Sequence, residues 1–476
     1  MTISISALDQ SPVLPKVNDN LEISEDLIRR FDSLGPRYTS YPTADRFHTD
    51  FTASSYIQYL EQRNQSSNKP PLSLYIHIPF CASLCYYCAC NKVITKDRSK
   101  SAIYLSYLVQ ELSLVKQYLT TRETVSQLHL GGGTPTFLSE EEMRGLMAML
   151  RENFDFADDA EISIEIDPRT VTTQTLQLLA DIGFNRTSLG VQDFDEQVQI
   201  AVHRIQPYAM VEQCINQSRA VGFESINFDL IYGLPKQSLE SFSRTLDQVI
   251  ALSPARIALY NYAHLPTRFK PQRRINEDEL PSAEQRLQIF LMSLRRLLAE
   301  GYVYIGLDHF AKPEDSLALA VKDKSLHRNF QGYTTRADCD LIALGLSSIG
   351  KLGASYVQNV RTLDDYYAAL DAGQLPVEKG FHLSQDDLLR REIIMDLMCC
   401  TTLDVAEIEK KYSIDFATYF QDELARMQSY VDEGLIRSND AAVNVTPKGR
   451  MFVRAFSMIF DKYLSRQSSA KYSKLI

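Results

Sequence analysis

Short apolar runs and amphipathic segments alternate along the middle of this 476-residue chain. Runs rich in β-branched and aromatic residues predict buried strands, and apolar residues at helical spacing predict helices between them. The predicted strands cover residues 73–80, 126–131, 161–167, 186–192, 225–232 and 256–262. The predicted helices cover residues 101–119, 139–152, 171–181, 195–202, 208–221 and 238–250. Six strand–helix units in succession predict an α/β fold, a parallel sheet curled into a partial or full barrel.

The pattern changes on both sides of these six units and predicts three regions. Residues 1–70 are polar and mixed, and form an N-terminal arm with a short helix around Glu25–Phe31. Residues 71–375 hold the barrel and an extension of it. Residues 376–476 form a mostly helical C-terminal domain with a hairpin around Leu435–Val445.

Composition and charge narrow the classes of function. The formal net charge of -10 argues against nucleic acid as the main partner. We see no signal peptide and no apolar stretch of membrane-spanning length. Half of the eight cysteines fall between positions 81 and 90, unlike an evenly spread disulfide framework. The sequence therefore predicts a cytoplasmic protein without a membrane or nucleic-acid partner, and nothing in it indicates that the protein is other than a monomer.

A cysteine loop follows the first predicted strand. Cys81, Cys85 and Cys88 stand at CxxxCxxC spacing, and thiolates this close in sequence can bind an iron–sulfur cluster or zinc. Three cysteines leave one iron of a four-iron cluster open, and an open iron can activate a substrate. Structural zinc is the alternative, with Cys90 or His77 as the fourth ligand, although no second CxxC motif is present.

Two more motifs end the second and third predicted strands. The sequence GGGTPT at residues 131–136 allows a ligand to approach the backbone, and its exposed N–H groups suit an anion. A tight turn that needs glycine is the alternative. Four polar residues share one face of the third strand, namely Glu161, Ser163, Glu165 and Asp167. Buried acids are costly unless paired, which predicts a polar ligand, with a solvated strand edge as the alternative.

Longer stretches resemble the radical S-adenosylmethionine enzymes, and among them the oxygen-independent coproporphyrinogen III oxidase family. They extend from the arm to the C-terminal domain, at residues 35–43, 75–81, 88–92, 229–236, 261–266, 327–335 and 446–450. The arm motif GPRYTSYPT and the sequence HRNFQGYTT at residues 327–335 are more specific than the cysteine loop.

The resemblance implies the cofactors and the residues that bind them. A [4Fe–4S] cluster is expected on Cys81, Cys85 and Cys88, together with two molecules of S-adenosylmethionine. The residues expected at the first molecule are Tyr75, Gly132, Glu165 and Ile349. The residues expected at the second molecule are Tyr87, Gly133, Thr134, Gln192, Arg204, Asp229 and Ala263.

The resemblance also implies a reaction of haem biosynthesis. A 5′-deoxyadenosyl radical removes hydrogen from the β-carbon of a propionate, and loss of CO₂ and an electron leaves a vinyl group. Two such rounds convert coproporphyrinogen III to protoporphyrinogen IX, with a reducing electron donor and an unidentified electron acceptor.

Further residues receive roles from their motifs. Cys90 and Tyr75 are candidate catalytic residues, although Cys90 has no ligand role and a packed free thiol is the alternative. Arg37 and Tyr38 of the arm are expected to close over the site. The residues expected to meet the carboxylates of the substrate are His327, Arg328 and Tyr333.

Related haem chaperones and haem-degrading radical methyltransferases are the alternative function. They resemble the chain in the cysteine loop, but typically have an aromatic residue at the position of Cys90 and lack the sequence of residues 327–335. These two features favour the oxidase.

Overall fold

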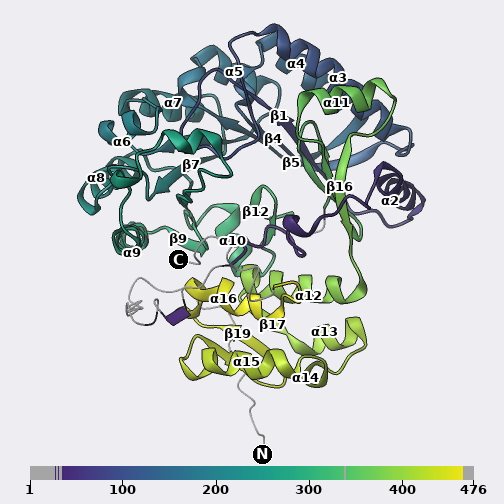
Figure 1. The fold of residues 1–476 in the computed structure, drawn as a ribbon, viewed down its shortest axis with the longest axis vertical. Helices are drawn as coiled ribbons and strands as arrows, with labels where there is room; N and C mark the ends of the chain where they lie inside the picture. Colours follow the sequence, from purple (N-terminus) through teal and green to yellow (C-terminus); the bar gives the residue numbers. More distant parts are fainter. Residues whose placement is uncertain (1–26, 28–29, 32–34, 337–338, 465–476) are drawn as a thin grey trace, which may run out of the picture.

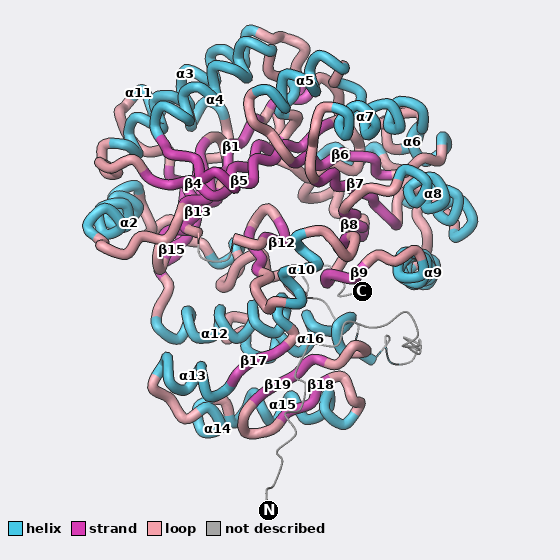
Figure 2. Tube along the Cα trace, turned by 180° about the vertical axis from the view of Figure 1, so that it is seen from behind, coloured by secondary structure: helices cyan, strands magenta, loops and turns pink. Residues whose placement is uncertain are grey.

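The fold is described by a computed structural model that covers residues 27, 30–31, 35–336 and 339–464 (Figure 1). The short helix predicted around Glu25–Phe31 lies largely outside the described residues. One twelve-stranded sheet curves through the molecule, and helices cover its outer face (Figure 2).

Six parallel strands form the middle of this sheet, in their order along the chain. They are β1 (Leu72–Ile78), β4 (Glu123–Gly132), β5 (Phe154–Ile166), β6 (Arg186–Gln192), β7 (Ser225–Tyr232) and β8 (Arg256–Asn261). The crossover helices are α3 (Ser99–Lys116), α4 (Glu140–Asn153), α5 (Thr173–Asp181), α6 (Glu196–Ala201), α7 (Tyr208–Ala220) and α8 (Leu239–Leu252). The predicted partial barrel of six strand–helix units is therefore confirmed.

The local sequence explains where several helices begin and which side chains of a strand are buried. Ser139, Thr172 and Ser238 cap α4, α5 and α8, and each side chain accepts a hydrogen bond from the N–H three residues on. In β5 the isoleucines at 162, 164 and 166 are buried beneath the helices, because alternate side chains of a strand point to opposite faces. The polar residues between them face the inside of the curve.

Additional strands extend both edges of the sheet and were not predicted. One edge continues through β13 (Asp340–Leu344), β14 (Ile349–Leu352), β15 (Ser355–Asn359) and β16 (Val377–His382). The other edge continues through β10 (His309–Ala311) and β9 (Val303–Gly306). The sheet thus reaches residue 382, past the boundary predicted at 375, and the domain limits themselves stay a prediction. The remaining helices of this part are α2 (Ala53–Gln65), α9 (Ala283–Ala299), α10 (Ser316–Lys322) and α11 (Leu363–Asp371).

The sheet does not close on itself, and two segments occupy its open side. The hairpin of β11 (His327–Asn329) and β12 (Gly332–Thr334) lies inside the curve, and the C-terminal region lies across the opening (Figures 1 and 2). The helices of that region are α12 (Gln385–Met395), α13 (Val405–Tyr412), α14 (Phe416–Tyr419), α15 (Gln421–Asp432) and α16 (Val453–Ser457). The predicted hairpin is formed by β18 (Ile436–Ser438) and β19 (Ala442–Val445), with β17 (Thr402–Asp404) added at its edge.

None of the described helices combines the length and the apolar composition that crossing a bilayer requires.

A buried carboxyl group joins the crossover layer to the added strands. Glu111 of α3 accepts hydrogen bonds from Gly345 N at 2.7 Å, Asn359 Nδ2 at 2.6 Å and the Tyr366 hydroxyl at 2.6 Å. Burial raises the pKa of Glu111 to about 7, and the hydrogen bonds only partly oppose that shift. The protonated form of Glu111 is therefore the one that the fold favours.

The raised pKa of Glu111 predicts a pH-dependent stability. The folded protein holds this proton up to about pH 7, whereas the unfolded chain releases it near the ordinary value of 4.5. The stabilisation is complete at low pH and is lost as the pH rises through this window. Between pH 5 and pH 8 we expect the free energy of unfolding to fall by roughly 3 kcal/mol more in the wild type than in Glu111→Gln.

Urea unfolding followed by circular dichroism at several pH values measures this difference. Glu152→Gln, at an exposed position of α4, is the matched control and should keep the wild-type pH dependence. Identical pH profiles for the wild type and Glu111→Gln would contradict the assignment.

Candidate active site

Parallel pairing brings the predicted motifs to one rim of the sheet. Ile78, which ends β1, is paired with Gly132, which ends β4, and Glu165 near the end of β5 is paired with Ser188 of β6. Since the carboxyl ends of parallel strands lie on the same side of a sheet, the cysteine loop, the glycine turn and the acidic strand meet there.

The cysteine loop is closed at its base by two short strands. β2 (Phe80–Cys81) pairs with β3 (Val93–Ile94), and Thr95 N donates to Cys81 O at 2.9 Å. The loop is also tied to the barrel, because Tyr86 N donates to Val202 O at 3.0 Å. The three predicted ligand cysteines thus lie on one anchored loop.

The surroundings of the thiols fit an electron-rich sulfur centre. Cys85 Sγ lies 3.5 Å from an Arg204 guanidinium nitrogen and 3.7 Å from one of Arg169. Cys81 Sγ lies 3.4 Å from the Thr134 hydroxyl oxygen. Burial raises the pKa of Cys81 to about 11, whereas a hydrogen bond with Cys90 lowers the pKa of Cys88.

All eight cysteines are free of disulfides, so the thiols of the loop are available as ligands. Among the described residues, no three His, Cys, Asp or Glu side chains are placed so that they could hold a single metal ion. The three thiols of the loop are of the ligand type that holds an iron–sulfur cluster, and two guanidinium groups lie beside Cys85.

The glycine turn needs glycine for steric reasons. Gly132 has φ of +113°, and a Cβ there would lie 2.6 Å from the His77 ring. A Cβ on Gly133 would lie 2.6 Å from Pro79 O. The glycines therefore let β4 pass close beside the base of the cysteine loop.

The N–H groups of this turn are used inside the protein, contrary to our expectation that they are exposed. Gly133 N donates to Ile78 O at 2.8 Å, and Thr134 N donates to Phe80 O at 2.9 Å. Gly132 N donates to Glu165 at 3.2 Å. These bonds fasten the glycine turn to the cysteine loop and to the acidic strand.

Three of the four residues predicted for the first S-adenosylmethionine lie together. Glu165 lies 3.4 Å from His129 Nε2, and His129 stacks on Tyr75 with ring centroids 5.9 Å apart. Burial opposes the charge of Glu165, but its interactions with His129 and Gly132 outweigh burial and lower the pKa of Glu165. His129, which sequence reasoning did not assign, joins Tyr75 to Glu165.

Ile349, the fourth residue, begins β14 on the far side of β13 from Tyr75. It packs against an apolar cluster of Phe47, Tyr356 and Leu383. One strand, β13, therefore stands between Ile349 and Tyr75, and the place of Ile349 at the first molecule stays a prediction.

The residues predicted for the second molecule come from several strand ends: Gln192 ends β6, Asp229 lies on β7 and Ala263 follows β8, whereas Gly133 and Thr134 follow β4 and Tyr87 lies in the cysteine loop. Arg204 is buried and donates to Asp167 at 3.0 Å and to Gly190 O at 2.7 Å. Arg204 is thus already paired with Asp167, a carboxylate of the protein. Nothing in the sequence indicated this ion pair. Asp229 accepts hydrogen bonds from Ser188 at 2.7 Å and Asn227 at 2.9 Å, and burial raises the pKa of Asp229 to about 6.

Gln272 connects two other residues of this set. Its amide nitrogen lies 3.0 Å from Tyr87 O and 3.2 Å from Ala263 O, and the side chain is buried. Gln192 ends β6 with φ of +68° beside Gly190. Gln272 lies outside every motif that we singled out, so only the fold brings it to the cysteine loop.

The acidic strand lines a cavity inside the curve, as its alternation predicted. This cavity of about 140 Å³ is bordered by Glu161, Ser163 and Glu165, by Asp229, and by the hairpin. Three of the four polar residues on that face of the strand therefore line the cavity, whereas Asp167 pairs with Arg169 and Arg204.

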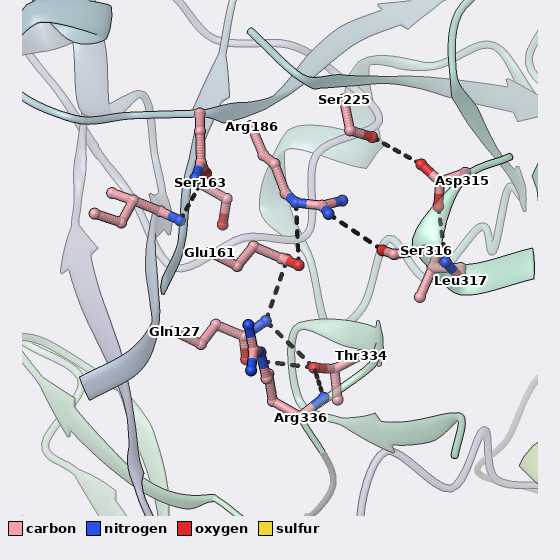
Figure 3. A network of polar contacts seen from close by, with 12 residues as sticks. Gln127, Glu161, Ser163, Arg186, Ser225, Asp315, Ser316, Leu317, Thr334 and Arg336 are labelled. Atoms are coloured by element: carbon pink, nitrogen blue, oxygen red, sulfur yellow. Dashed lines mark hydrogen bonds and ion pairs between the residues drawn. The ribbon is translucent and has the colours of Figure 1, made fainter. Parts of the chain in front are cut away.

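A polar network holds the hairpin against the strands (Figure 3). Gln127 Nε2 lies 3.2 Å from Glu161 and 3.3 Å from the Thr334 hydroxyl oxygen. Arg186 pairs with Glu161 at 3.1 Å and donates to Ser316 at 3.1 Å. The sequence HRNFQGYTT thus lies inside the barrel and not on its surface.

The arm motif lies at the junction of the sheet edge and the C-terminal region. Arg37 pairs with Asp308, and the Tyr38 hydroxyl donates to Asp461 at 2.9 Å. The structure therefore places the two arm residues in contacts with these acids, on the side of the barrel that the C-terminal region covers.

A curved parallel sheet with a three-cysteine loop after its first strand defines a radical S-adenosylmethionine enzyme. Residues 75–249 match the radical SAM superfamily, and residues 383–452 match the HemN C-terminal domain. Enzymes of this class bind a [4Fe–4S] cluster and S-adenosylmethionine, which settles the choice between cluster and zinc.

Relatives and a solved structure narrow the class further. The oxygen-independent coproporphyrinogen III oxidase of Pseudomonas aeruginosa is 48% identical over 96% of this chain and 100% of its own. The protein of the same name from Escherichia coli is 45% identical over 94% of this chain and 98% of its own. A solved structure of coproporphyrinogen III oxidase (HemN) from Escherichia coli has a TM-score of 0.86 at 45% identity, covering 90% of this chain and 98% of that one. The chain therefore belongs to the oxygen-independent coproporphyrinogen III oxidase family.

The tight contact at Gly133 predicts a sensitive position. In Gly133→Ala the new methyl group would overlap Pro79 O, so the base of the cysteine loop must shift. We expect at least about a 10-fold loss of S-adenosylmethionine affinity or of activity, since displaced supporting groups cost about that much. Equilibrium binding of S-adenosylmethionine to the anaerobically reconstituted protein measures the affinity, and cleavage of S-adenosylmethionine measures the activity.

Gly145→Ala is the matched control, because a Cβ at this position of α4 meets nothing within 4 Å. Helix propensity favours alanine there, so stability and binding should be retained. Wild-type affinity and activity in Gly133→Ala would contradict the steric argument.

Proposed function

We propose that the protein converts coproporphyrinogen III to protoporphyrinogen IX without oxygen, by oxidative decarboxylation of two propionates to vinyl groups in haem biosynthesis. The observation that carries this proposal is the 48% identity over 96% of the chain to a protein of that name. The match includes the C-terminal region as well as the cysteine loop, so it extends beyond what all radical S-adenosylmethionine enzymes share.

Cys81, Cys85 and Cys88 would hold the [4Fe–4S] cluster in this proposal. When bound, the cluster supplies the electron that cleaves S-adenosylmethionine to give the 5′-deoxyadenosyl radical. The protein contributes the surroundings of the cluster, because the guanidinium groups of Arg169 and Arg204 place positive charge beside Cys85. Cys90 is exposed at the end of the loop and stays a candidate catalytic residue together with Tyr75.

We assign the first S-adenosylmethionine to Tyr75, Gly132 and Glu165, with Ile349 retained from the family pattern. Glu165 is kept ionised by His129 and can accept hydrogen bonds from an amine or ribose hydroxyls. A second molecule is assigned to Tyr87, Gly133, Thr134, Gln192, Arg204, Asp229 and Ala263. What supports it is that Arg204 Nε is buried without a hydrogen-bond partner among the described residues.

The partners follow from the same proposal. The reaction needs a one-electron donor, and an acceptor of unknown identity takes the electron that each decarboxylation releases. We infer that the protein acts as a monomer in the cytoplasm, without nucleic acid or membrane. Haem chaperones and haem-degrading methyltransferases are not favoured, because Cys90 and the sequence of residues 327–335 are both present.

An anaerobic assay tests the function. Reconstituted protein receives S-adenosylmethionine, a reductant, an electron acceptor and coproporphyrinogen III, and mass spectrometry follows protoporphyrinogen IX. Cys85→Ser should lower turnover by more than about 100-fold, since even supporting groups of a metal site cost 10- to 100-fold.

Cys400→Ser is the matched control, because this thiol lies outside the loop and donates to Lys324 O. Formation of 5′-deoxyadenosine without a decarboxylated product would refute the substrate assignment. A Cys85→Ser protein that keeps its cluster and its turnover would refute the ligand assignment.

A further inference from the structure

A second cavity, of about 390 Å³, lies between the hairpin, the amino ends of two strands and helix α12. Ser73 of β1 and Asp340 of β13 line it, whereas the cysteine loop follows the carboxyl end of β1. Ser73 and Ile78 are separated by about 17 Å of strand. The cavity therefore lies toward the opposite end of the barrel from the cysteine loop.

Arg328 of β11 lines this cavity, and its buried guanidinium lacks part of its hydrogen-bond partners among the described residues. Arg328 is only 5% exposed to solvent. Among the described residues, neither its Nε nor its Nη1 atom has a hydrogen-bond partner. Its guanidinium lies 4.8 Å from the centre of the Tyr333 ring, a contact that does not neutralise charge. A buried guanidinium in this state is costly and calls for an anion.

Arg391 of α12 provides a second such group on the opposite wall. Its Nη1 atom is also buried, and it has no hydrogen-bond partner in the part of the chain that the structure describes. His327 lies within electrostatic reach of it, since burial and the charges of Lys351 and Arg391 lower the pKa of His327 to about 4. Cations from two separate parts of the fold thus converge on one cavity.

The acidic residues of the cavity are occupied elsewhere. Asp340 is paired with Arg63 at 2.6 Å, and Glu392 is paired with Lys411 at 2.8 Å. Asp396 lies beside Glu392, and burial together with this neighbour raises the pKa of Asp396 to about 7. None of these carboxyl groups forms an ion pair with Arg328 or Arg391 in the described part of the chain, and the acid within electrostatic reach of Arg328 is Asp308, which is paired with Arg37.

We propose that this cavity binds the carboxylates of the two propionates that the reaction leaves intact, with Arg328 and Arg391 as their partners. This inference rests on the proposed function, in which coproporphyrinogen III carries four propionates and loses two. Arginine suits the task because its planar fork of donors matches a carboxylate. Asn329 lines both this cavity and the one inside the curve, so the two cavities adjoin at the hairpin.

Binding of a non-reacting analogue tests the proposal. Coproporphyrin III, the fully oxidised tetrapyrrole, is titrated into the reconstituted full-length protein and followed by its fluorescence. Arg328→Gln and Arg391→Gln should each weaken binding about 10-fold or more, the size of a hydrogen bond to a charged group. Arg391→Lys should recover part of the affinity.

Two controls give the result its meaning. Arg437→Gln, at an exposed position of β18, should bind coproporphyrin III as the wild type does. The tetramethyl ester of coproporphyrin III lacks the carboxylates, so its affinity should not respond to Arg328→Gln or Arg391→Gln. Each variant should keep the cluster absorbance and the cleavage of S-adenosylmethionine without substrate, which shows that its fold is intact.

Unchanged affinity for coproporphyrin III in both arginine variants would overturn the proposal. The proposal would also fall if inorganic phosphate raised the melting temperature of the wild type but not of the variants, while coproporphyrin III affinity stayed the same. The cavity would then serve a separate small anion. If coproporphyrin III binding depends on both arginines but no protoporphyrinogen IX forms, the cavity assignment stands and the proposed reaction fails.

Discussion

Parallel pairing of β1, β4, β5, β6, β7 and β8 is the constraint on which the rest of the structure depends. It sets the carboxyl ends of all six strands on one rim, and the helices that return the chain occupy the outer face. The cysteine loop, the glycine turn and the acidic strand need no contact with one another in sequence to meet in space. The hydrogen bond from Gly132 to Glu165 and the contact of Thr134 with Cys81 then fix their spacing.

An open barrel leaves polar strand residues that need partners on its inner side. The hairpin supplies some of them, because Thr334 completes the network of Gln127 and Glu161. The same insertion carries Arg328 and Tyr333 toward the C-terminal region. The hairpin and the C-terminal region occupy the open side of the barrel. They thus supply polar side chains to its inner side that its own strands do not provide.

The six central strands and their helices could be predicted because their signal is local: apolar runs, helical spacing and caps such as Ser139. The added strands escaped prediction because they are short, and the pairing that joins them to the central sheet is distant in sequence, as between Leu72 and Asp340. The same holds at the site. The spacing of Cys81, Cys85 and Cys88 indicated ligands, but nothing local shows that Arg204 contacts Asp167 and Cys85, or that Gln272 holds Tyr87 and Ala263.

The charges differ between the rim that carries the cysteine loop and the cavity beside α12. The two places therefore favour different parts of the proposed tetrapyrrole substrate. The rim holds the carboxylate of Glu165 and the thiols of the cysteine loop, and the guanidinium groups of Arg169 and Arg204 lie beside Cys85. Free propionates near that rim would meet like charge, which is unfavourable in a buried site. The cavity beside α12 has the opposite character, because Arg328 and Arg391 lack full partners there. Coproporphyrinogen III has four propionates. When one of them lies at the rim, the arginines of the cavity beside α12 favour the orientation that places the other carboxylates there.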